Sequence, residues 1–487
     1  PTGRTLTYGE LTEAIKAFAA GLAARGFGKG DVLCVYMPNL PEYVIAFHGT
    51  ASIGAMCTTA NPLYTANEVA HQLEDSGAKA ILTAAQFLDQ ATEAAERAGI
   101  SEVFVVGEAP AGSGAEPFSA LLGDPAETPD IKIDPGSDLA VLPYSSGTTG
   151  LPKGVMLSHR NLVANTIQSA SALAPVREDV LIAVLPFFHI YGMQVIMNLG
   201  LRHGSTLVTM PRFDLEQFLD LIEEHRVTRV YLVPPIALGL AKHPAVEGRD
   251  LSSVDLIMSG AAPLGAELSE KLAKRIGADV IQGYGLTETS PVTHTIRRER
   301  NKPGSVGPPL PATECRLVDP ETGEGVGDGE RGELWIRGPQ VMKGYLNNQE
   351  ATDATIDADG WLHTGDIGVR DADDHYEIVD RLKELIKFKG FQVAPAELEA
   401  LIVNHPQVAD VAVIGVPDEE AGELPKAYIV PSGEDLDIEA LQAWVAEQVS
   451  PQKKIRLVEL IDEIPKSPSG KILRRVLKDR EQAAGVS

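Results

Sequence analysis

Hydrophobic residues near the start of the chain recur with the spacing of a helix. The segment LTEAIKAFAAGLAARGF places four apolar side chains on one helical face: Leu11, Ile15, Phe18 and Leu22. A turn beginning at Gly28 follows, and then the apolar run GDVLCVYM, which is typical of a strand buried on both faces. The pattern predicts a helix, a short turn and a buried strand.

Strand-like apolar runs recur further along the chain, and each alternates with a helical pattern. They are AKAILTA (78–84), SEVFVVG (101–107), STLVTM (205–210), VTRVYLVPP (227–235) and VDLIMSG (254–260). Alternation of this kind implies α/β layers with largely parallel sheets. The segment 108–138 is dense in Ala, Pro, Gly and acidic residues, and it predicts a surface loop.

The most apolar stretch of the chain is VLIAVLPFFHIYGMQVIMNLGL, residues 180–201. Its length raises the question of a membrane span, but four residues interrupt it: Pro186, His189, Gln194 and Asn198. We therefore predict a buried core segment that touches a ligand pocket, and no transmembrane segment.

The pattern changes after Pro303. ECRLVDPETGEGVGDGERGELWIRG predicts two antiparallel strands around a Gly-rich turn, and the segment from Asp380 onward predicts a separate α+β unit. The predicted fold is therefore α/β, with a large N-terminal body of mixed and parallel sheets layered with helices and a small β-subdomain. A small α+β C-terminal domain follows. We call these two parts the body (residues 1–379) and the cap (residues 385–487).

Composition narrows the class of protein. The 487 residues carry a formal net charge of −26, which argues against a nucleic-acid partner or an anionic membrane surface. Cys34, Cys57 and Cys315 lie far apart, so neither a disulfide framework nor a zinc site is expected, and a reducing cytoplasm fits. A segment that binds an anionic ligand must therefore be a local exception to this overall negative charge.

The segment YSSGTTGLPKGVMLSH, residues 144–159, offers such an exception. It follows an apolar run, it is rich in Gly, Ser and Thr, and it contains one lysine. Small residues let backbone N–H groups approach a phosphate, hydroxyls donate to its oxygens, and lysine adds positive charge. The Gly-Lys-Ser/Thr sequence of a Walker motif is absent from it, so the segment predicts a phosphate-binding loop of another kind.

Four further segments follow in this order along the chain: QGYGLTETSP (282–291), GWLHTGDIG (360–368), DRLKELIKFKGFQVAPAELE (380–399) and PKSPSGKILRR (465–475). Together with YSSGTTGLPKG they resemble the signature motifs of adenylate-forming enzymes. These are acyl- and aryl-CoA ligases, peptide adenylation domains and firefly-type luciferases. LPFFHIYG, SGAAPLG and KGFQVAPAELE look most like the 4-coumarate–CoA ligase branch.

The resemblance implies that the phosphates are those of ATP. It assigns the loop to the β- and γ-phosphates, with Gly147 and Gly150 permitting close backbone approach. The implied phosphate contacts are Ser145, Ser146, Thr148, Thr149 and Lys153. Further residues implied to bind the nucleotide are Gln282, Gly283, Tyr284, Gly285, Thr287, Asp366 and Arg381.

Within these motifs, the resemblance also implies particular roles. Tyr284 offers a flat face to adenine, Thr287 a hydroxyl to the α-phosphate, and Glu288 a carboxylate to Mg²⁺. Asp366 and Arg381 grip the ribose, and an ion pair between these two residues is compatible with that role.

Several residues of the cap complete the implied chemistry. Lys471 is the implied catalytic lysine, whose charge draws the substrate carboxylate and the α-phosphate together. Lys387 and Gln392 are expected near the reacting centre, and Lys389 and Gly390 beside the passage for coenzyme A. Lys383 matches the hinge of the family, so residues 380–384 form the predicted hinge about which the mobile cap presents its two faces in turn.

The acyl pocket follows from the same motifs. Its implied walls are His189, Tyr191, Val195, Ala261, Gly283, Gly285, Leu286, Pro291 and Val292. They are apolar and uncharged, so a carboxylic acid with a neutral body is expected, either 4-coumarate or a related hydroxycinnamate, or a medium-chain fatty acid.

The resulting prediction is an ATP-, Mg²⁺- and CoA-dependent acid–thiol ligase, a monomer or homodimer in the cytoplasm. The alternatives are an adenylation enzyme that loads a carrier protein, a luciferase-like monooxygenase, and a nucleotide-binding protein without catalysis.

Overall fold

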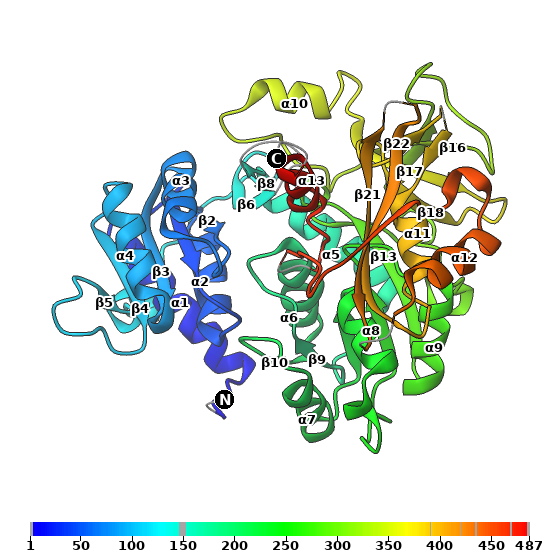
Figure 1. The fold of residues 1–487 in the computed structure, drawn as a ribbon. Coiled ribbons are helices and arrows are strands. Elements are labelled where there is room, and N and C mark those ends of the chain that lie inside the picture. Colours follow the sequence, from blue (N-terminus) through cyan, green and yellow to red (C-terminus); the bar gives the residue numbers. More distant parts are fainter. Residues whose placement is uncertain are drawn as a thin grey trace.

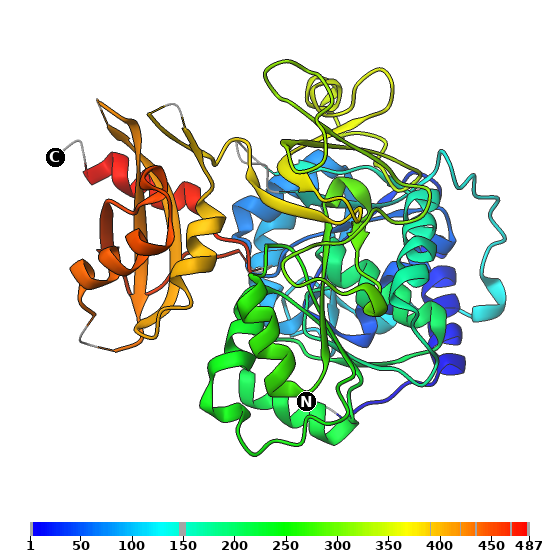
Figure 2. The same ribbon diagram turned by 90° about the vertical axis from the view of Figure 1, so that its right-hand side faces the viewer.

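The computed structural model is an α/β protein with four sheets. In Figure 1 the first sheet, coloured blue to cyan, lies on the left and reaches the centre at β6 and β8, and the second, in green, lies in the centre. Figure 2 shows the cap, coloured orange to red, standing at one side of the body. The structure describes residues 3–145, 152–389, 391–418, 420–433, 436–467 and 470–484.

The first sheet has eight strands in the order β5-β4-β3-β1-β2-β6-β7, with β8 also paired to β6. Only β7 and β8 run antiparallel to their neighbour β6. The strands are β1 (Val32–Tyr36), β2 (Met56–Thr59), β3 (Ala78–Ala84), β4 (Glu102–Val106), β5 (Glu116–Pro117), β6 (Leu139–Ser145), β7 (Lys153–Gly154) and β8 (Leu157–Ser158).

Helices cover both faces of this sheet. They are α1 (Tyr8–Ala24), α2 (Pro41–Ser52), α3 (Ala66–Ser76) and α4 (Leu88–Arg97). In β1, Leu33 and Val35 pack into the core that contains α1 and α2, whereas Cys34 packs into the core that contains α3 and α4. Burial on both faces explains the continuous apolar sequence of β1, because alternate side chains point to opposite faces.

The second sheet has six strands in the order β10-β9-β11-β12-β13-β14. All neighbours run parallel except β13 and β14. The strands are β9 (Val180–Ala183), β10 (Thr206–Thr209), β11 (Arg229–Leu232), β12 (Leu256–Ser259), β13 (Asp279–Gly285) and β14 (Val292–Thr295). Its helices are α5 (His159–Leu173), α6 (Leu199–His203), α7 (Leu215–His225), α8 (Pro234–Lys242) and α9 (Ala266–Ile276), with a π-helix at Gly192–Asn198.

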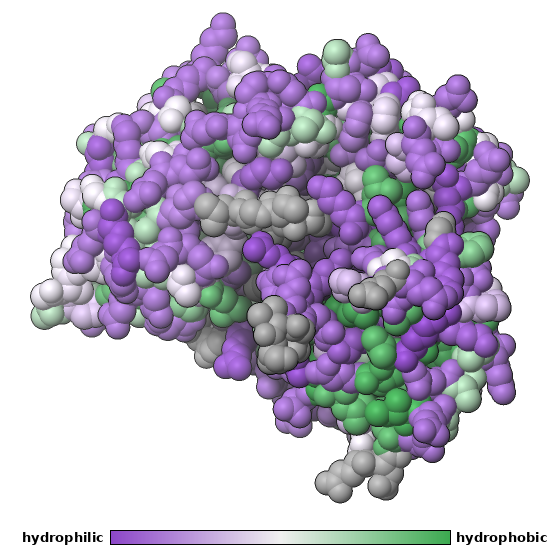
Figure 3. Space-filling view, turned by 45° about the horizontal axis from the view of Figure 1, so that its top comes forward, coloured by the Kyte–Doolittle hydropathy of each residue, from purple (hydrophilic) through white to green (hydrophobic). Residues whose placement is uncertain are grey.

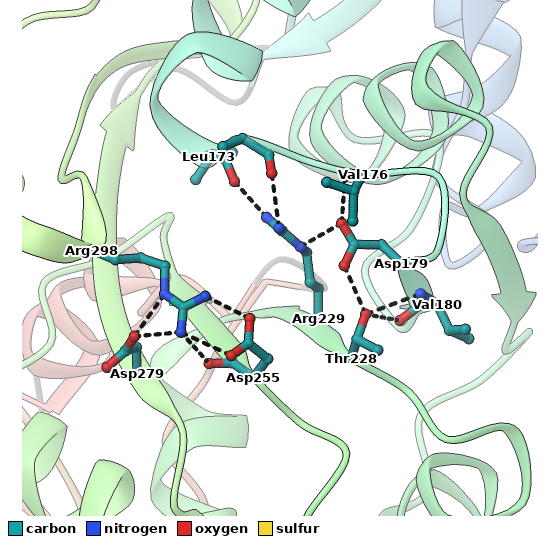
Figure 4. Close-up of polar contacts among 10 residues, drawn as sticks. Leu173, Val176, Asp179, Val180, Thr228, Arg229, Asp255, Asp279 and Arg298 are labelled. Carbon is teal, nitrogen blue, oxygen red and sulfur yellow. Dashed lines mark hydrogen bonds and ion pairs between the residues drawn. The ribbon is translucent and has the colours of Figure 1, made fainter.

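Two arginines tie the strands of the second sheet together at their amino ends (Figure 4). Arg229, the first residue of β11, pairs with Asp179, which directly precedes β9, and Nε lies 2.7 Å from Oδ2. Arg298 pairs with both Asp255, just before β12, and Asp279, at the start of β13. The first pair is buried and the second is exposed. Both lie at the opposite end of the strands from the loops that carry the motifs.

The third sheet is antiparallel, in the order β15 (Glu314–Val318), β16 (Arg331–Arg337), β17 (Leu362–Arg370) and β18 (Tyr376–Arg381). Helix α10 (Gln349–Thr355) lies in the connection between β16 and β17. This sheet is the predicted β-subdomain, and its β15–β16 hairpin is the predicted antiparallel pair around a Gly-rich turn.

The cap contains the fourth sheet, in the order β20-β19-β22-β21, with β23 also paired to β22. Its strands are β19 (Ile386–Phe388), β20 (Phe391–Val393), β21 (Val408–Asp418), β22 (Gly422–Pro431) and β23 (Leu457–Leu460). Its helices are α11 (Pro395–Ile402), α12 (Ile438–Gln448) and α13 (Arg474–Ala484). A hydrophobic core of its own, including Leu398, Val413 and Leu441, supports the α+β unit predicted from the sequence.

Short one-turn helices fill several connections: Ala85–Phe87, Phe118–Leu121, Pro125–Glu127, Pro244–Val246, Thr287–Thr289, Arg298–Arg300 and Pro451–Lys453. Two of them, together with β5, lie in the segment 108–138, so the prediction of a simple surface loop there was incomplete. Leu121 in this segment is fully buried, and a Cβ at Gly21 of α1 would lie 2.2 Å from its carbonyl oxygen. The segment is anchored to α1 by this close backbone contact.

The apolar stretch 180–201 is a core segment, as predicted: it contains β9, the π-helix and the start of α6. Within the described ranges, no helix is both long enough and apolar enough to span a membrane. Hydrophilic residues cover most of the molecular face shown in Figure 3.

Candidate active site

Three of the predicted motifs lie at the carboxyl ends of neighbouring strands in the second sheet. LPFFHIYG follows β9, SGAAPLG begins at the last residue of β12, and QGYGLTETSP begins within β13. These strands and β11 run parallel, so their carboxyl ends meet at one edge of the sheet. Ligands of open α/β sheets bind in the crevice outside that edge.

Lys471 reaches this edge on the loop that precedes α13 of the cap. The loop folds back on itself: the Lys471 N–H donates to Oγ of Ser467 at 3.1 Å, and the Ser467 N–H donates to the Lys471 carbonyl at 2.8 Å. Gly470 has φ of 75°, and a Cβ there would lie 2.9 Å from a methyl carbon of Val233, just before α8. Glycine therefore allows both the left-handed backbone and the close contact with the body.

The surroundings of Lys471 are those of an enclosed cation. Burial, and secondly the charge of Arg381, lower its pKa to about 8, although the carboxylates of Asp366 and Glu288 act in the opposite direction. The Lys471 ammonium in turn contributes, after burial, to a pKa of about 4 for His189. Five residues from five predicted motifs thus interact in one place.

Asp366 is 4% exposed and lies at the centre of a polar contact. The Tyr284 hydroxyl donates to its Oδ2 at 2.6 Å, and Nε of Arg381 lies 3.3 Å from its Oδ1. The backbone arranges this contact, because Asp366 and Arg381 are register partners in β17 and β18. Burial raises the pKa of Asp366, while Arg381 and the Tyr284 hydroxyl act against that rise. The ion pair considered from the sequence is therefore present.

Glu288 forms hydrogen bonds with side chains from two distant segments of the chain. Its Oε1 accepts hydrogen bonds from the Ser145 hydroxyl and the Tyr345 hydroxyl, each at 2.9 Å. Nζ of Lys153 lies 4.0 Å from the centre of the Tyr345 ring, in a cation–π contact. Tyr345 is 6% exposed, and burial raises its pKa.

Tyr345 was missed by the sequence analysis, because it lies outside all five motifs. A single aromatic residue after a Gly-rich loop carries no signal of a site by itself. Its contacts link Glu288 to Lys153, which places it beside the predicted phosphate-binding loop. Ser146, Gly147, Thr148, Thr149 and Gly150 lie outside the described residues.

The residues present fit an adenine nucleotide. Oε1 of Gln282 accepts the Leu264 N–H at 2.8 Å, and the side chain is 4% exposed. Its Nε2 is buried without a hydrogen-bond partner among the residues that the structure describes. A buried donor left unpaired is costly, and the ring nitrogens of adenine are acceptors that can satisfy it.

The fit to magnesium is more limited. Within the described part of the chain, no three His, Cys, Asp or Glu side chains come together as a metal cluster. Mg²⁺ commonly binds through one or two carboxylates together with substrate phosphates. Glu288, beside the phosphate-binding residues, is suited to a magnesium ion of that kind and not to a site made by protein alone.

Two glycines of β13 let neighbouring segments pack closely against the strand. A Cβ at Gly283 would lie 2.0 Å from Cε of Met258, and one at Gly285 would lie 1.9 Å from the carbonyl oxygen of Pro291. The chain turns back tightly after Gly285, since the Leu286 N–H donates to that same carbonyl at 3.2 Å. Thr287 begins the one-turn helix within this turn. Larger residues at either glycine would displace neighbouring atoms.

The predicted acyl pocket has a fixed aromatic wall. The Tyr191 hydroxyl donates to the carbonyl of Met258 at 3.1 Å, and a Cβ at Gly260 would lie 3.0 Å from the Tyr191 ring. Nδ1 of His189 accepts the Tyr191 N–H at 3.3 Å, and the pKa of about 4 keeps His189 neutral at pH 7. Val195 is buried in the π-helix, Val292 is buried in β14, and Ala261 has φ of 69° in the loop after β12. π-Helices and positive φ values are frequent at functional sites.

Another group of predicted residues lies on a different face of the cap. Lys387, Lys389 and Gln392 belong to the β19–β20 hairpin, and their side chains are exposed, whereas Lys471 is enclosed. Lys389 pairs with Glu420 at 2.6 Å. Lys383 is exposed, and Gly390 lies outside the described residues. The structure brings Lys471, and not this hairpin, to the crevice.

This arrangement defines a class of enzyme. Such an enzyme binds a nucleotide at the carboxyl ends of a parallel sheet and receives a lysine from a second structural unit. Residues 1–346 match the AMP-binding enzyme family and residues 397–471 match the AMP-binding enzyme C-terminal domain. The chain therefore belongs to the AMP-binding enzyme family, and the predicted family is confirmed.

Curated relatives match over nearly the whole chain. The chain is 45% identical to 4-coumarate–CoA ligase 3 of Oryza sativa subsp. japonica, over 100% of this chain and 89% of that protein. It is 46% identical to 4-coumarate–CoA ligase 2 of Solanum tuberosum, over 99% and 90%. It is also 46% identical to 4-coumarate–CoA ligase 1 of Petroselinum crispum, over 98% and 90%.

Solved structures confirm the predicted fold. ATP-bound MatB from Rhodopseudomonas palustris superimposes with a TM-score of 0.89 at 31% identity, over 99% of this chain and 94% of that chain. The anthranilate CoA ligase AuaEII, in complex with anthranoyl-AMP, superimposes with a TM-score of 0.93 at 27% identity, over 100% and 94%.

Proposed function

We propose that this chain is an ATP-dependent carboxylic acid–CoA ligase that acts on 4-coumarate or a related hydroxycinnamate. The first step joins the acid to the α-phosphate and releases pyrophosphate, and the second transfers the acyl group to the thiol of CoA and releases AMP. The observation that carries the proposal is Lys471 enclosed at the crevice beside Asp366 and Glu288. The 4-coumarate–CoA ligases that are 45% and 46% identical to this chain support the class of enzyme and the proposed substrate.

In the first step, the side chains of the crevice bring two anions together. Lys471 stabilises the negative charge shared by the carboxylate and the α-phosphate, and Thr287 donates its hydroxyl to that phosphate. Ser145 and Lys153 bind the departing phosphates together with residues 146–150. Glu288 would hold Mg²⁺, which would neutralise phosphate charge. Asp366, Arg381, Tyr284 and Gln282 orient the nucleoside.

The second step needs a different face of the cap. The exposed hairpin with Lys387, Lys389 and Gln392 suits the passage of CoA, but it is turned to solvent in this structure. We infer that the body (1–379), the hinge (380–384) and the cap (385–487) are the units of a rotation about Lys383. The present orientation, with Lys471 enclosed, suits the first step.

A disulfide can test this rotation. A Cβ built at Gly265 of the body lies 3.5 Å from Cβ of Ala400 in the cap, within the range that disulfides span. Oxidised Gly265→Cys/Ala400→Cys enzyme should keep ATP–pyrophosphate exchange but lose thioester formation, and reduction should restore it. Each single-cysteine variant is the control. Thioester formation at the unchanged rate in fully oxidised enzyme would refute the rotation.

The acid is expected to be neutral apart from its carboxylate. The pocket walls are apolar or neutral, because the pKa of about 4 leaves His189 uncharged at pH 7. The rigid wall formed by Tyr191 favours a flat aryl group over a flexible chain. CoA-dependent AMP release with 4-coumarate and with octanoate tests this preference. A clear preference for octanoate would move the assignment to a medium-chain fatty acid.

Activity with neither acid but with a carrier protein would instead favour a carrier-loading enzyme. Absence of acid-dependent ATP–pyrophosphate exchange would favour a non-catalytic nucleotide binder. Light emission or O₂ consumption would indicate a luciferase-like monooxygenase. The cytoplasmic location and the monomeric or dimeric state stay predictions.

A further inference from the structure

The residue that precedes helix α11 of the cap provides no hydrogen-bond acceptor for the amino end of that helix. Its first residue is Pro395, and the preceding residue, Ala394, has no side chain that can accept a hydrogen bond. The first N–H groups of a helix have no partner within the helix, and a side-chain oxygen usually accepts from one of them. An acceptor for α11 must therefore come from elsewhere.

The acceptor comes from the body side of the hinge. Oδ2 of Asp380 accepts the Ala396 N–H at 2.9 Å, and its Oδ1 accepts the Arg381 N–H at 2.7 Å. Asp380 lies in β18, which pairs along its length with β17 of the third sheet. It is 5% exposed. The buried carboxylate of the first hinge residue, which β18 fixes to the third sheet, thus accepts the unpaired N–H at the amino end of α11.

The carboxyl end of α11 is also held by the body. Nζ of Lys242, the last residue of α8, donates to the carbonyl of Val403 at 2.7 Å. Val403 directly follows the last residue of α11, at the end where carbonyl groups lack helical donors. Burial lowers the pKa of Lys242, and Lys271 on α9 adds to this effect while Glu267 opposes it.

We propose that Asp380 and Lys242 are positioning residues that clamp α11 at both ends, and so hold the cap in the orientation that encloses Lys471. The charges have the favourable signs, since an anion stabilises a helix amino terminus and a cation stabilises its carboxyl terminus. The inference rests on the proposed function only for its catalytic readout.

A short path connects the clamp to the catalytic lysine. Glu399 lies within α11, and its Oε2 pairs with a guanidinium nitrogen of Arg474 at 2.6 Å. Arg474 begins α13, directly after the Lys471 loop, and it also donates to the carbonyl of Val413 at 3.2 Å. Both members of the Glu399–Arg474 pair are largely buried. Fixing α11 therefore fixes the base of the loop that carries Lys471.

Another ion pair between body and cap is less suited to this role. Arg331 and Glu397 are 3.8 Å apart and both are more than 40% exposed. Exposed pairs of this length contribute little. The backbone hydrogen bonds of Asp380 and Lys242 are shorter and bind the two ends of one helix, so they define its position more closely.

The catalytic test separates the two half-reactions. Lys242→Met keeps the aliphatic stem but removes the charge, and we expect it to slow ATP–pyrophosphate exchange by about fivefold. Thioester formation from supplied acyl-adenylate should stay at the wild-type rate or rise. Lys242→Arg should restore exchange. Lys271→Met is the matched control, because Lys271 pairs with Glu267 of its own helix at 2.6 Å.

The Gly265→Cys/Ala400→Cys pair gives a second readout that needs no substrate. At a fixed oxidant concentration, its rate of disulfide formation measures how much of the protein holds this orientation. Added Lys242→Met should slow the crosslink by about fivefold, and Lys271→Met should not. Asp380→Asn, which weakens the acceptor, should act in the same direction.

The outcomes distinguish this inference from the proposed function. A wild-type protein without exchange activity would refute the ligase, but the crosslinking rates would still test the clamp. Equal crosslinking in Lys242→Met and wild type would overturn the clamp. So would an equal loss of both half-reactions in Lys242→Met, because that result would indicate general damage and not a shift in cap orientation.

Discussion

The buried position of Lys471 predicts an unusual pH dependence for adenylate formation. A lysine in water titrates near pH 10.5, whereas burial lowers the pKa of Lys471 to about 8. Because the charged form is the active one, activity should be lost as the pH rises through that value. With a pKa of about 8, the protonated fraction falls from about 90% at pH 7 to about 10% at pH 9.

The assay is ATP–pyrophosphate exchange at ATP concentrations well below KM, because kcat/KM reports ionisation of the free enzyme. We expect kcat/KM to fall about tenfold between pH 7 and pH 9, at constant ionic strength. Lys471→Arg is the control, since a guanidinium stays protonated across this range. Its residual activity should not decline in the same way. A wild-type profile that is flat to pH 9 would refute the inferred pKa and the enclosure behind it.

Three further substitutions test separate parts of the structure. Lys471→Ala should slow adenylate formation by roughly 10²–10³-fold but spare thioester formation from supplied adenylate, and equal loss of both would contradict its role. Tyr345→Phe keeps the ring beneath Lys153 but removes the hydrogen bond to Glu288. The Mg²⁺ concentration needed for half-maximal ATP–pyrophosphate exchange should therefore rise several-fold, and Tyr36→Phe, in β1, is the control. Arg229→Met leaves the buried Asp179 unpaired and should lower the free energy of unfolding in urea by about 3–5 kcal/mol, whereas Arg298→Met, in the exposed pair, should cost about 1 kcal/mol or less.

Local patterns predicted the elements well where burial is simple. The run at 78–84 is β3 residue for residue, and the helix predicted at the start of the chain is α1. Both have apolar spacings that a helix or a doubly buried strand imposes. The segment 108–138 was harder to predict, because its packing against α1, through Leu121 and Phe118, depends on neighbours about a hundred residues away.

The motifs in the sequence predicted which residues form the site, but they did not predict the geometry of the site. The sequence contains Ser145 and Glu288, but their hydrogen bond joins residues 143 positions apart. Tyr345 carries no local signal, since its importance comes from lying between Glu288 and Lys153 in space. The clamp on α11 is similar, because Lys242 meets Val403 across 161 positions. Contacts of this kind depend on the packing of whole units, which periodicity does not describe.

The charges at the crevice imply that nucleotide binding and cap closure are coupled. A pKa of about 8 in place of 10.5 means that enclosing the charged Lys471 costs about 3 kcal/mol at neutral pH. A capping hydrogen bond and a helix-end charge contribute about 1 kcal/mol each, so the Asp380 and Lys242 clamp offsets only part of that cost. The phosphates of ATP bring the missing negative charge to Lys471, and they raise its pKa by doing so. Bound ATP therefore favours closure further, and this added stabilisation of the closed cap decreases once pyrophosphate has carried part of that charge away.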